Sequence, residues 1–307
     1  MSAARRLRLL LLVGACILLA ATFADPELSL ERPTYRYVFV FDITQSMNVA
    51  DVPTAPPATS RLAWARQSAN QALAALPCGT EVGLALFSGH RAFLLIKPVE
   101  TCANYHELRQ MIDGIDWRMA WEARSEVAKG LFKSIELVAA IGTDDRLVFF
   151  SDGHEAPPIN PDVPPRFDGE PGAVAGLVVG VGGDALVPIP RFDEDNHPLG
   201  VWHAHDVLHT DTFTADQRKR AGERPIVGTE HLSSLREAYL QALASKTGLG
   251  YHRLRDGDDL LQALEQPALA IPREVTTDAR WLLALAALCA FLASYLGRSS
   301  PRRRGAG

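Results

Sequence analysis

The sequence predicts a three-layer α/β domain, Rossmann-like in outline, with a mostly parallel central sheet over residues 35–270. Short runs of apolar, β-branched and aromatic residues recur between residues 37 and 254, and such runs are typical of strands buried on both faces. Stretches with helical patterning separate them, and strands that alternate with helices favour a parallel sheet covered by helices. The composition, 47% hydrophobic and 22% charged, is that of a globular protein.

The first half of the domain is expected to form a strand, a helix and a hairpin. Residues 37–41, Tyr-Val-Phe-Val-Phe, form the first buried strand, and a Pro-rich loop leads from it to a helix over residues 61–76. Two more strands, residues 81–88 and 92–97, are split at Ser88-Gly89-His90, and this short connection predicts an antiparallel hairpin.

The second half continues the alternation and contains an insertion. Helices are expected at residues 104–115 and 125–141. A buried strand at residues 146–150 and a strand at 173–181 follow them. Residues 184–230 show no regular pattern and are predicted to be an insertion in the domain. The last expected elements are a helix, a strand and a helix, at residues 232–246, 251–254 and 258–269.

The N-terminal residues 1–24 are predicted to be a signal peptide or a signal anchor. Three arginines precede or enter an apolar run that has no acidic residue and ends near the small residues Ala21 and Ala24. Removal by signal peptidase and retention as an anchor both remain open. In either case the residues that follow are exported.

The C-terminal residues 279–297 are predicted to be a transmembrane helix. Residues 281–296 are almost uninterruptedly apolar, and at about 1.5 Å per residue they are just long enough to cross a bilayer core. An amphipathic or buried core helix is the alternative. Residues 298–307 carry four arginines, which by the positive-inside rule predicts a basic cytoplasmic tail. The domain is then expected at the periplasmic face of a bacterial inner membrane.

The charge distribution separates the domain from its ends. The formal net charge of the chain is −5, and the eight arginines of the two terminal segments leave residues 25–278 with −13. Such an acidic domain is a poor candidate for binding nucleic acid or anionic lipid and a good one for binding cations or basic surfaces.

The four cysteines fall into two groups. Cys78 and Cys102 lie in the exported part, where an oxidising periplasm favours a disulfide between them over a metal site or a nucleophile. Cys16 and Cys289 lie in the predicted membrane segments and are expected to be apolar fillers.

Polar side chains follow two of the buried strands directly. Asp42, Thr44 and Ser46 come after residues 37–41, and Ser151 and Asp152 come after residues 146–150. Because parallel sheets bind ligands at the carboxyl ends of their strands, these side chains are expected to converge. Carboxylates and hydroxyls form an oxygen-only set that suits a hard divalent ion, Mg²⁺ first, with Ca²⁺ or Mn²⁺ as alternatives.

Asp42-x-Thr44-x-Ser46 resembles the Asp-x-Ser-x-Ser signature of the von Willebrand factor A (vWA) family. Asp152 matches the family's aspartate after the fourth strand. Ser125 takes the place of its loop threonine, although Glu122-Ala123-Arg124 stands where the family has Gly-Gly. The resemblance covers residues 35–183 and, more faintly, 232–269.

The resemblance implies a metal-ion-dependent adhesion site (MIDAS). In such a site one coordination position stays open for an Asp or Glu of a protein partner, so the domain binds and does not catalyse. Gln45, Met47 and Asn48 are then candidates for partner contact, with Met47 packing under the loop as the alternative for that residue. Two other interpretations remain: Asp42, Thr44 and Ser46 only satisfy the loop backbone, or the fold is present with an inactive metal site.

Within the family, three segments look most like MxaL-type accessory proteins: residues 41–49, 76–79 and 98–102. This resemblance implies a factor for the maturation or metal insertion of a periplasmic quinoprotein such as methanol dehydrogenase. Its partners would be other inner-membrane and periplasmic assembly proteins and a MoxR-type ATPase. Bat-type membrane proteins, parts of a stress-related membrane complex, are the close alternative.

The insertion carries a histidine cluster, with His203, His205 and His209 around Asp206. These residues suggest an alternative function, a zinc hydrolase. The other interpretation is that they are ordinary solvent-exposed histidines of a loop. The insertion's Phe192, Trp202 and Phe213 are candidates for a partner-contacting surface over the sheet edge. A surface adhesin is disfavoured, because two membrane anchors would hold the domain at the inner membrane.

Overall fold

The structure is a computed structural model that describes residues 3–52 and 59–296, so the predicted tail at 298–307 lies outside the described residues. The chain divides into two compact units. One is the globular domain, Pro33–Ile271, which is close to the predicted 35–270. The other joins the N-terminal Met1–Arg32 with the C-terminal Pro272–Gly307.

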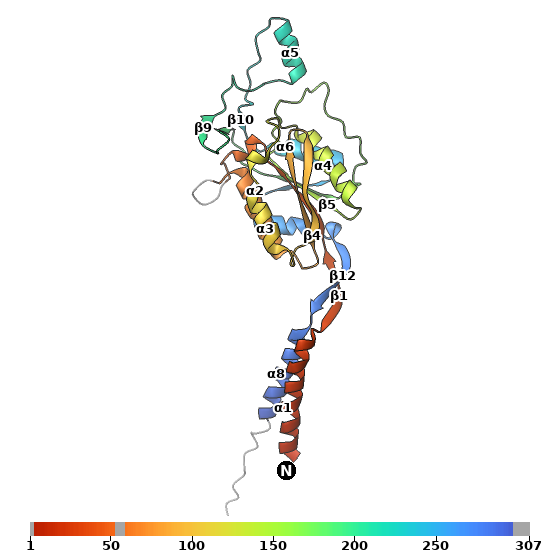
Figure 1. Cartoon of the computed structure of the whole chain (residues 1–307). Coiled ribbons are helices and arrows are strands. Elements are labelled where there is room, and N and C mark those ends of the chain that lie inside the picture. Colours follow the sequence, from red (N-terminus) through yellow and green to blue (C-terminus); the bar gives the residue numbers. More distant parts are fainter. Residues whose placement is uncertain (1–2, 53–58, 297–307) are drawn as a thin grey trace, which may run out of the picture. The chain divides into compact units, whose positions relative to one another are not determined.

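The globular domain is built on a six-stranded sheet with the order β4-β3-β2-β5-β6-β11 (Figure 1). All neighbours are parallel except β3 and β4, which form the predicted antiparallel hairpin. The strands are β2 (Arg36–Asp42), β3 (Glu81–Ser88), β4 (Arg91–Glu100), β5 (Arg146–Ser151), β6 (Gly176–Gly180) and β11 (Gly250–Arg253). This is the doubly wound order, whose direction reverses between β2 and β5. The prediction of a mostly parallel α/β sheet is confirmed.

Helices cover both faces of the sheet. One face packs against α2 (Arg61–Ala75), α3 (Tyr105–Gly114) and α7 (Gly257–Leu264), and the other against α4 (Val127–Ile141) and α6 (Glu237–Thr247). Alternate residues of β2 serve the two layers: Phe39 lies in the first core and Val38 in the second, both fully buried. An uninterrupted apolar strand is what a sheet covered on both sides requires.

Two helices begin or end differently from the prediction. The helix expected at residues 232–246 begins only at Glu237, because Leu232–Ser233 forms β10 and pairs with β7 (Val187–Pro188). The helix expected at residues 258–269 ends at Leu264, since a proline at position 267 opens a separate 3₁₀ turn, η4 (Pro267–Leu269).

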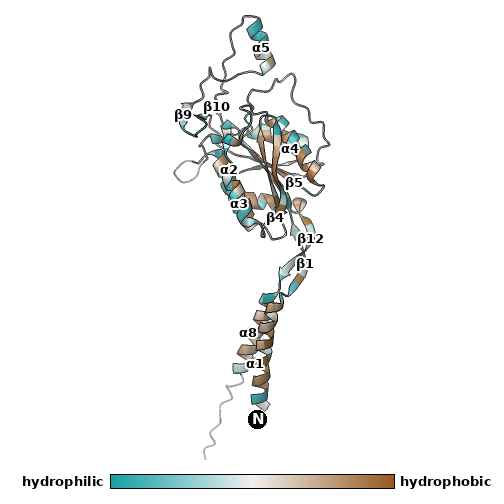
Figure 2. Ribbon diagram, viewed as in Figure 1, coloured by the Kyte–Doolittle hydropathy of each residue, from teal (hydrophilic) through white to brown (hydrophobic). Residues whose placement is uncertain are grey.

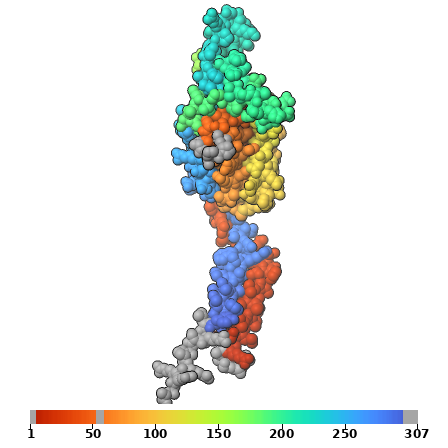
Figure 3. Space-filling view, turned by 90° about the vertical axis from the view of Figure 1, so that its left-hand side faces the viewer, coloured from red at the N-terminus to blue at the C-terminus, as the bar shows by residue number. Residues whose placement is uncertain are grey.

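The insertion, predicted as irregular, contains local structure of its own. It forms the hairpin of β8 (Pro190–Phe192) and β9 (Pro198–Val201), and the helix α5 (Thr212–Arg220). Trp202 donates from Nε1 to Oε1 of Gln45 at 2.5 Å, which fixes the insertion on η2 (Gln45–Asn48). Figure 3 shows the insertion as a green layer directly above the orange part of the chain that includes α2.

The second unit consists of two apolar helices and a two-stranded ribbon. The helix α1 (Ala3–Ala21) packs along α8 (Arg280–Leu296), and β1 (Glu27–Thr34) pairs with β12 (Ile271–Asp278), a ribbon the sequence did not predict. Both helices are strongly hydrophobic (Figure 2). In the described part of the chain, Arg5–Ala24 is the one stretch long and apolar enough to cross a membrane; the apolar helix at Arg280–Tyr295 is shorter.

Candidate metal-binding site

The loops after β2 and β5 meet at the carboxyl edge of the sheet, where the strand order reverses. A site for ligands is expected at such a switch point. The loop after β2 brings Asp42, Thr44 and Ser46, and the loop after β5 brings Ser151 and Asp152. None of these side chains is more than 3% exposed.

Hydrogen bonds connect the two loops side chain by side chain. Thr44 donates from Oγ1 to Oδ1 of Asp42 at 2.7 Å, and Ser46 donates from Oγ to Oδ1 of Asp152 at 3.1 Å. Ser151 donates from Oγ to Oδ2 of Asp42 at 2.7 Å. Each hydroxyl therefore gives its one proton to a carboxylate. Thr44 and Ser46 keep lone pairs for another partner, whereas the Ser151 oxygen accepts the backbone N–H of Gly153 at 3.0 Å. The Thr44 and Ser46 oxygens lie 3.5 Å apart, close enough to share one ion.

Ser125, the third predicted hydroxyl ligand, lies just before α4. Its backbone exchanges hydrogen bonds with Ala156, N to O at 2.8 Å and 2.7 Å, which holds the side chain in place. The hydroxyl oxygen is buried and has no hydrogen-bond partner among the described residues. A buried hydroxyl without a partner costs about 1–3 kcal/mol. This atom therefore indicates a partner that the protein itself does not supply.

The three predicted hydroxyl ligands face one cavity. Thr44, Ser46 and Ser125 all line a pocket of about 250 Å³. The predicted ligands are hydroxyls and carboxylates, an oxygen-only set that suits Mg²⁺, Ca²⁺ or Mn²⁺. One imidazole, that of His154, lines the same cavity. The donor set thus fits the predicted ion.

Burial and charge act in opposite ways on the two carboxyl groups. Burial, followed by the charge of Asp152, raises the pKa of Asp42 to about 7. Burial also acts to raise the pKa of Asp152, but Arg61, His154 and the hydrogen bonds that this carboxylate accepts together outweigh it, so that pKa is lowered. Of the two carboxyl groups, Asp152 therefore ionises more readily.

Arg61 is a central residue that the sequence did not single out. Its side chain is fully buried and donates from Nη1 to Oδ2 of Asp152 at 2.5 Å and to Oγ of Ser233 at 2.7 Å. It also forms a two-pronged ion pair with Asp51, Nε to Oδ1 at 2.9 Å and Nη2 to Oδ2 at 2.6 Å. The sequence does contain one sign of its burial: Arg61 lies four residues before Ala65, and residues four apart share one face of a helix, here the buried face of α2.

The three residues proposed for partner contact lie in different environments. Gln45 accepts the hydrogen bond from Trp202, whereas Met47 is fully buried in the core. The burial of Met47 agrees with the alternative in which it packs under the loop, so this side chain does not face a partner. Asn48 lines a small neighbouring cavity, and its buried Nδ2 has no partner in the described structure.

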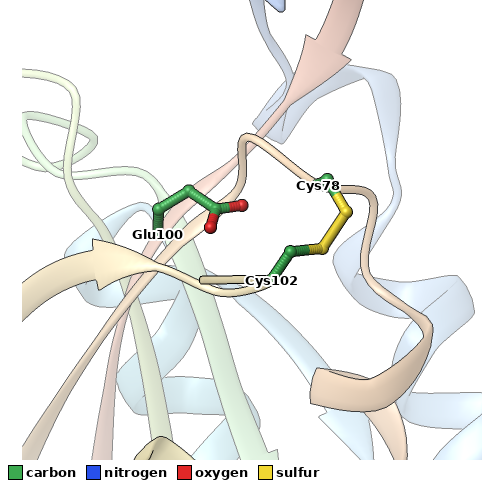
Figure 4. Close-up of side chains that lie close together, drawn as sticks. All are labelled: Cys78, Glu100 and Cys102. Atoms are coloured by element: carbon green, nitrogen blue, oxygen red, sulfur yellow. A yellow bond between two sulfur atoms is a disulfide. The ribbon is translucent and has the colours of Figure 1, made fainter. Parts of the chain in front are cut away.

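Cys78 and Cys102 are joined in the predicted disulfide, with a Cα–Cα distance of 5.3 Å. Together with Glu100 they form the only group of three His, Cys, Asp or Glu ligand atoms within 4.8 Å of one another in the described ranges (Figure 4). The two sulfurs are bonded to each other, and the Glu100 carboxylate accepts backbone N–H groups of Gly79 and Ala103 at 2.8 Å and 2.6 Å. The group is therefore a structural corner.

The insertion histidines form no such group among the residues described. The rings of His203 and His205 stack at 5.5 Å, and Nε2 of His209 is hydrogen bonded to the carbonyl oxygen of Ala204 at 2.7 Å. Their arrangement is explained by contacts within the loop.

No family model matches the chain. A UPF0353 protein of Mycobacterium sp. (strain KMS) is 32% identical over 171 residues, which cover 52% of this chain and 47% of that protein. A UPF0353 protein of Mycobacterium leprae (strain TN) is 28% identical over 171 residues, with the same two shares of 52% and 47%. The chain thus spans about half the length of the curated relatives it matches, and their names state no activity.

Three solved structures are similar at low sequence identity. An aerotolerance-related membrane protein from Bacteroides fragilis NCTC 9343 is 18% identical with a TM-score of 0.47, over 76% of this chain and 97% of that one. BatB from Bacteroides thetaiotaomicron is 17% identical with a TM-score of 0.48, over 75% and 95%. The ArnB paralog VWA2 from Sulfolobus acidocaldarius is 14% identical with a TM-score of 0.39, over 78% and 46%. Because these TM-scores are low, the fold assignment rests on the strand order described above.

Proposed function

We propose that this protein is a membrane-anchored vWA-type module that binds a divalent ion, Mg²⁺ first, and through it a carboxylate of a protein partner. The ligands are Asp42, Thr44, Ser46, Ser125 and Asp152. One observation carries the proposal: three buried hydroxyls from two loops face a single cavity, and two of them are oriented by carboxylates behind them.

The protein's own residues prepare this site before any ligand arrives. Asp42 and Asp152 accept the hydroxyl protons of Thr44 and Ser46, which turns the lone pairs of those oxygens away from the carboxylates. Arg61 donates to the other carboxylate oxygen of Asp152, Oδ2. A bound divalent ion supplies a Lewis-acid centre for an anionic side chain. No bond is broken, so we propose a binding role and no reaction.

The zinc hydrolase is the competing function. It requires at least three ligands around one ion, and the described histidines of the insertion are instead stacked or bonded to the loop backbone. We therefore favour the binding module over an enzyme.

The proposed location is the periplasmic face of a bacterial inner membrane. The apolar helix at the N-terminus supports membrane attachment, and the Cys78–Cys102 disulfide supports an oxidising compartment. We propose partners among membrane and periplasmic assembly proteins. The narrower expectations, a quinoprotein maturation factor working with a MoxR-type ATPase or a part of a Bat-type complex, rest on the resemblance of short segments alone.

Calorimetric titration of the full-length protein in lipid nanodiscs with Mg²⁺ and Mn²⁺ tests the metal site. Asp42→Ala, Asp152→Ala and Ser125→Ala are expected to weaken ion binding by at least about tenfold. Asp168→Ala removes an exposed acid outside the site and serves as the control. Equal ion binding by wild type and Asp42→Ala would exclude the proposed site.

A further inference from the structure

The pocket above the three hydroxyls has a second, apolar side that the metal site does not explain. Beyond Thr44, Ser46 and Ser125, the cavity of about 250 Å³ is lined by the insertion residues Trp202, Val207 and Leu208. The insertion is fixed there by the hydrogen bond from Trp202 to Gln45. A cavity this small is below the usual range for drug-sized ligands, so it accommodates one or two side chains and not a broad protein surface.

A buried histidine completes the polar side of the same pocket. His154 lines the cavity, its side chain is only 2% exposed, and neither ring nitrogen has a hydrogen-bond partner within the described chain. A buried polar group is normally paired, so an imidazole without a partner beside an orphaned serine hydroxyl points to a polar ligand. Ser125 is explained by the ion, whereas His154 remains available to a ligand bound to that ion.

The charge around the pocket limits what that ligand can be. Asp206 and Glu230 stand among the lining residues with one arginine, Arg124, whose guanidinium is paired with Glu122 at 3.2 Å, and residues 25–278 carry −13 overall. A cluster of acidic residues would be repelled, while a single carboxylate is attracted by the ion. The neighbouring group on the ligand must suit Trp202 and Leu208, which means that it is apolar.

From these observations we infer that the pocket binds one acidic side chain together with an adjacent bulky aliphatic side chain, both from an extended segment of the partner. This inference rests on the proposed metal bridge and adds the partner's chemistry. The carboxylate would coordinate the ion and accept a hydrogen bond from His154. The aliphatic side chain would pack on Trp202 and Leu208. The insertion is then the part of the domain that selects the partner.

Fluorescence polarisation with short labelled peptides tests this inference on the full-length protein in nanodiscs. The probes are hexapeptides whose central pair is glutamate–leucine, glutamate–glycine or glutamine–leucine, each with and without Mg²⁺. The glutamate–leucine peptide is expected to bind only with Mg²⁺. It should bind about 3–10-fold more tightly than glutamate–glycine, which reflects the burial of one aliphatic side chain. The glutamine peptide should not bind.

Three variants separate the contacts. Leu208→Ser should lose the preference for the glutamate–leucine peptide, because Leu208 lines the pocket. Leu186→Ser is the control and should keep that preference. Leu186 also lies in the insertion and is similarly exposed, 48% against 47% for Leu208, but it does not line the pocket. His154→Phe replaces the imidazole with an apolar ring and should weaken both glutamate peptides about 3–10-fold, the effect of one hydrogen bond. Ion binding by this variant is measured separately, so that a loss of the ion is not mistaken for a loss of the hydrogen bond.

The possible failures are distinguishable. If ions bind but no glutamate peptide does, or if glutamate–leucine and glutamate–glycine bind equally in wild type, the pocket inference is overturned and the metal site stands. If no ion binds, the proposed function fails as well. A free branched-chain carboxylic acid that displaces the peptide at equal concentration would identify a small carboxylate as the ligand and overturn the assignment to a peptide.

Discussion

Arg61 shows how one residue joins segments that are far apart in the sequence. Its guanidinium contacts Asp51 before α2, Asp152 after β5 and Ser233 in β10. Burial alone acts to lower the pKa of Arg61, but the two carboxylates outweigh it and raise that pKa, so the side chain stays charged. A buried ion pair is tolerated only when every partner is present, because each charge alone would be strongly destabilising.

Removal of Arg61 is therefore expected to destabilise the domain. Arg61→Met leaves Asp51 and Asp152 without their cation and should lower the free energy of unfolding by about 3–5 kcal/mol. The control is Arg109→Met, since Arg109 forms an exposed ion pair with Asp113 and should change stability by no more than about 1 kcal/mol. Urea unfolding followed by tryptophan fluorescence measures both. Similar midpoints for the two variants would contradict the structural role of Arg61.

Glu155 gives the stability of the domain a predictable pH dependence. Burial raises the pKa of Glu155 to about 7, and the charge of Glu126 adds to this rise. The hydrogen bonds from Tyr239 and from the backbone of Ala128 and Val127 act in the opposite direction and lower that pKa. Between its ordinary pKa and about 7 the folded state holds a proton that the unfolded state releases. Stability is therefore expected to fall as the pH rises through this window.

Glu155→Gln should reduce this fall, since glutamine does not titrate. Comparison of the urea midpoints at pH 5 and pH 8 measures it, with Glu136→Gln, at a side chain 62% exposed, as the control. A smaller slope should remain, because the pKa of Asp42 is raised in the same direction. An unchanged slope in Glu155→Gln would show that its carboxyl group is not the source.

At the scale of elements, local patterns predicted most of the sheet. The unbroken apolar runs of β2 and β5 and the short connection between β3 and β4 are signals carried by neighbouring residues. β10 has two residues, Leu232–Ser233, and pairs with β7, which is 44 positions earlier. A two-residue strand has no period to read, so its pairing was not predictable. Likewise, Asp42 and Asp152 could be found from the two buried apolar runs that they end, whereas Arg61, from α2, joins the site only through tertiary packing. His154 lies two residues after Asp152 in the same loop, but the sequence does not show that its ring enters the pocket.

The packing of α4 on β3 depends on a glycine. A Cβ at Gly130 would lie 2.0 Å from Cε2 of Phe87, whereas a Cβ at Gly114 in α3 would meet nothing within 4 Å. Alanine favours helix by about 1 kcal/mol over glycine. Gly114→Ala is therefore expected to be neutral or stabilising, while Gly130→Ala should destabilise by about 1–3 kcal/mol, because the helix and Phe87 must separate. Thermal unfolding of the pair decides this, and a stabilised Gly130→Ala would refute the close approach.

At the scale of the whole molecule, the distribution of charge and cysteine suggests how the chain is placed in the cell. The two terminal segments carry eight arginines and no acidic residue, whereas residues 25–278 carry −13. The Cys78–Cys102 disulfide lies in the acidic part, and the free thiols Cys16 and Cys289 lie in the apolar helices. These features fit a domain outside the cytoplasmic membrane with basic ends inside it.

Labelling of single cysteines tests this topology. In a background with Cys16→Ala and Cys289→Ala, Val227→Cys introduces a thiol at a site 77% exposed in the insertion, and Ala306→Cys introduces one in the basic tail. A maleimide that cannot cross membranes should label Val227→Cys on spheroplasts with an intact inner membrane and should label Ala306→Cys only after that membrane is permeabilised. The position of the basic residues predicts this asymmetry, because positive segments are retained in the cytoplasm. If both thiols react from outside, the C-terminal helix does not span the membrane; if neither reacts, the domain is not exported and its metal site faces cytoplasmic partners.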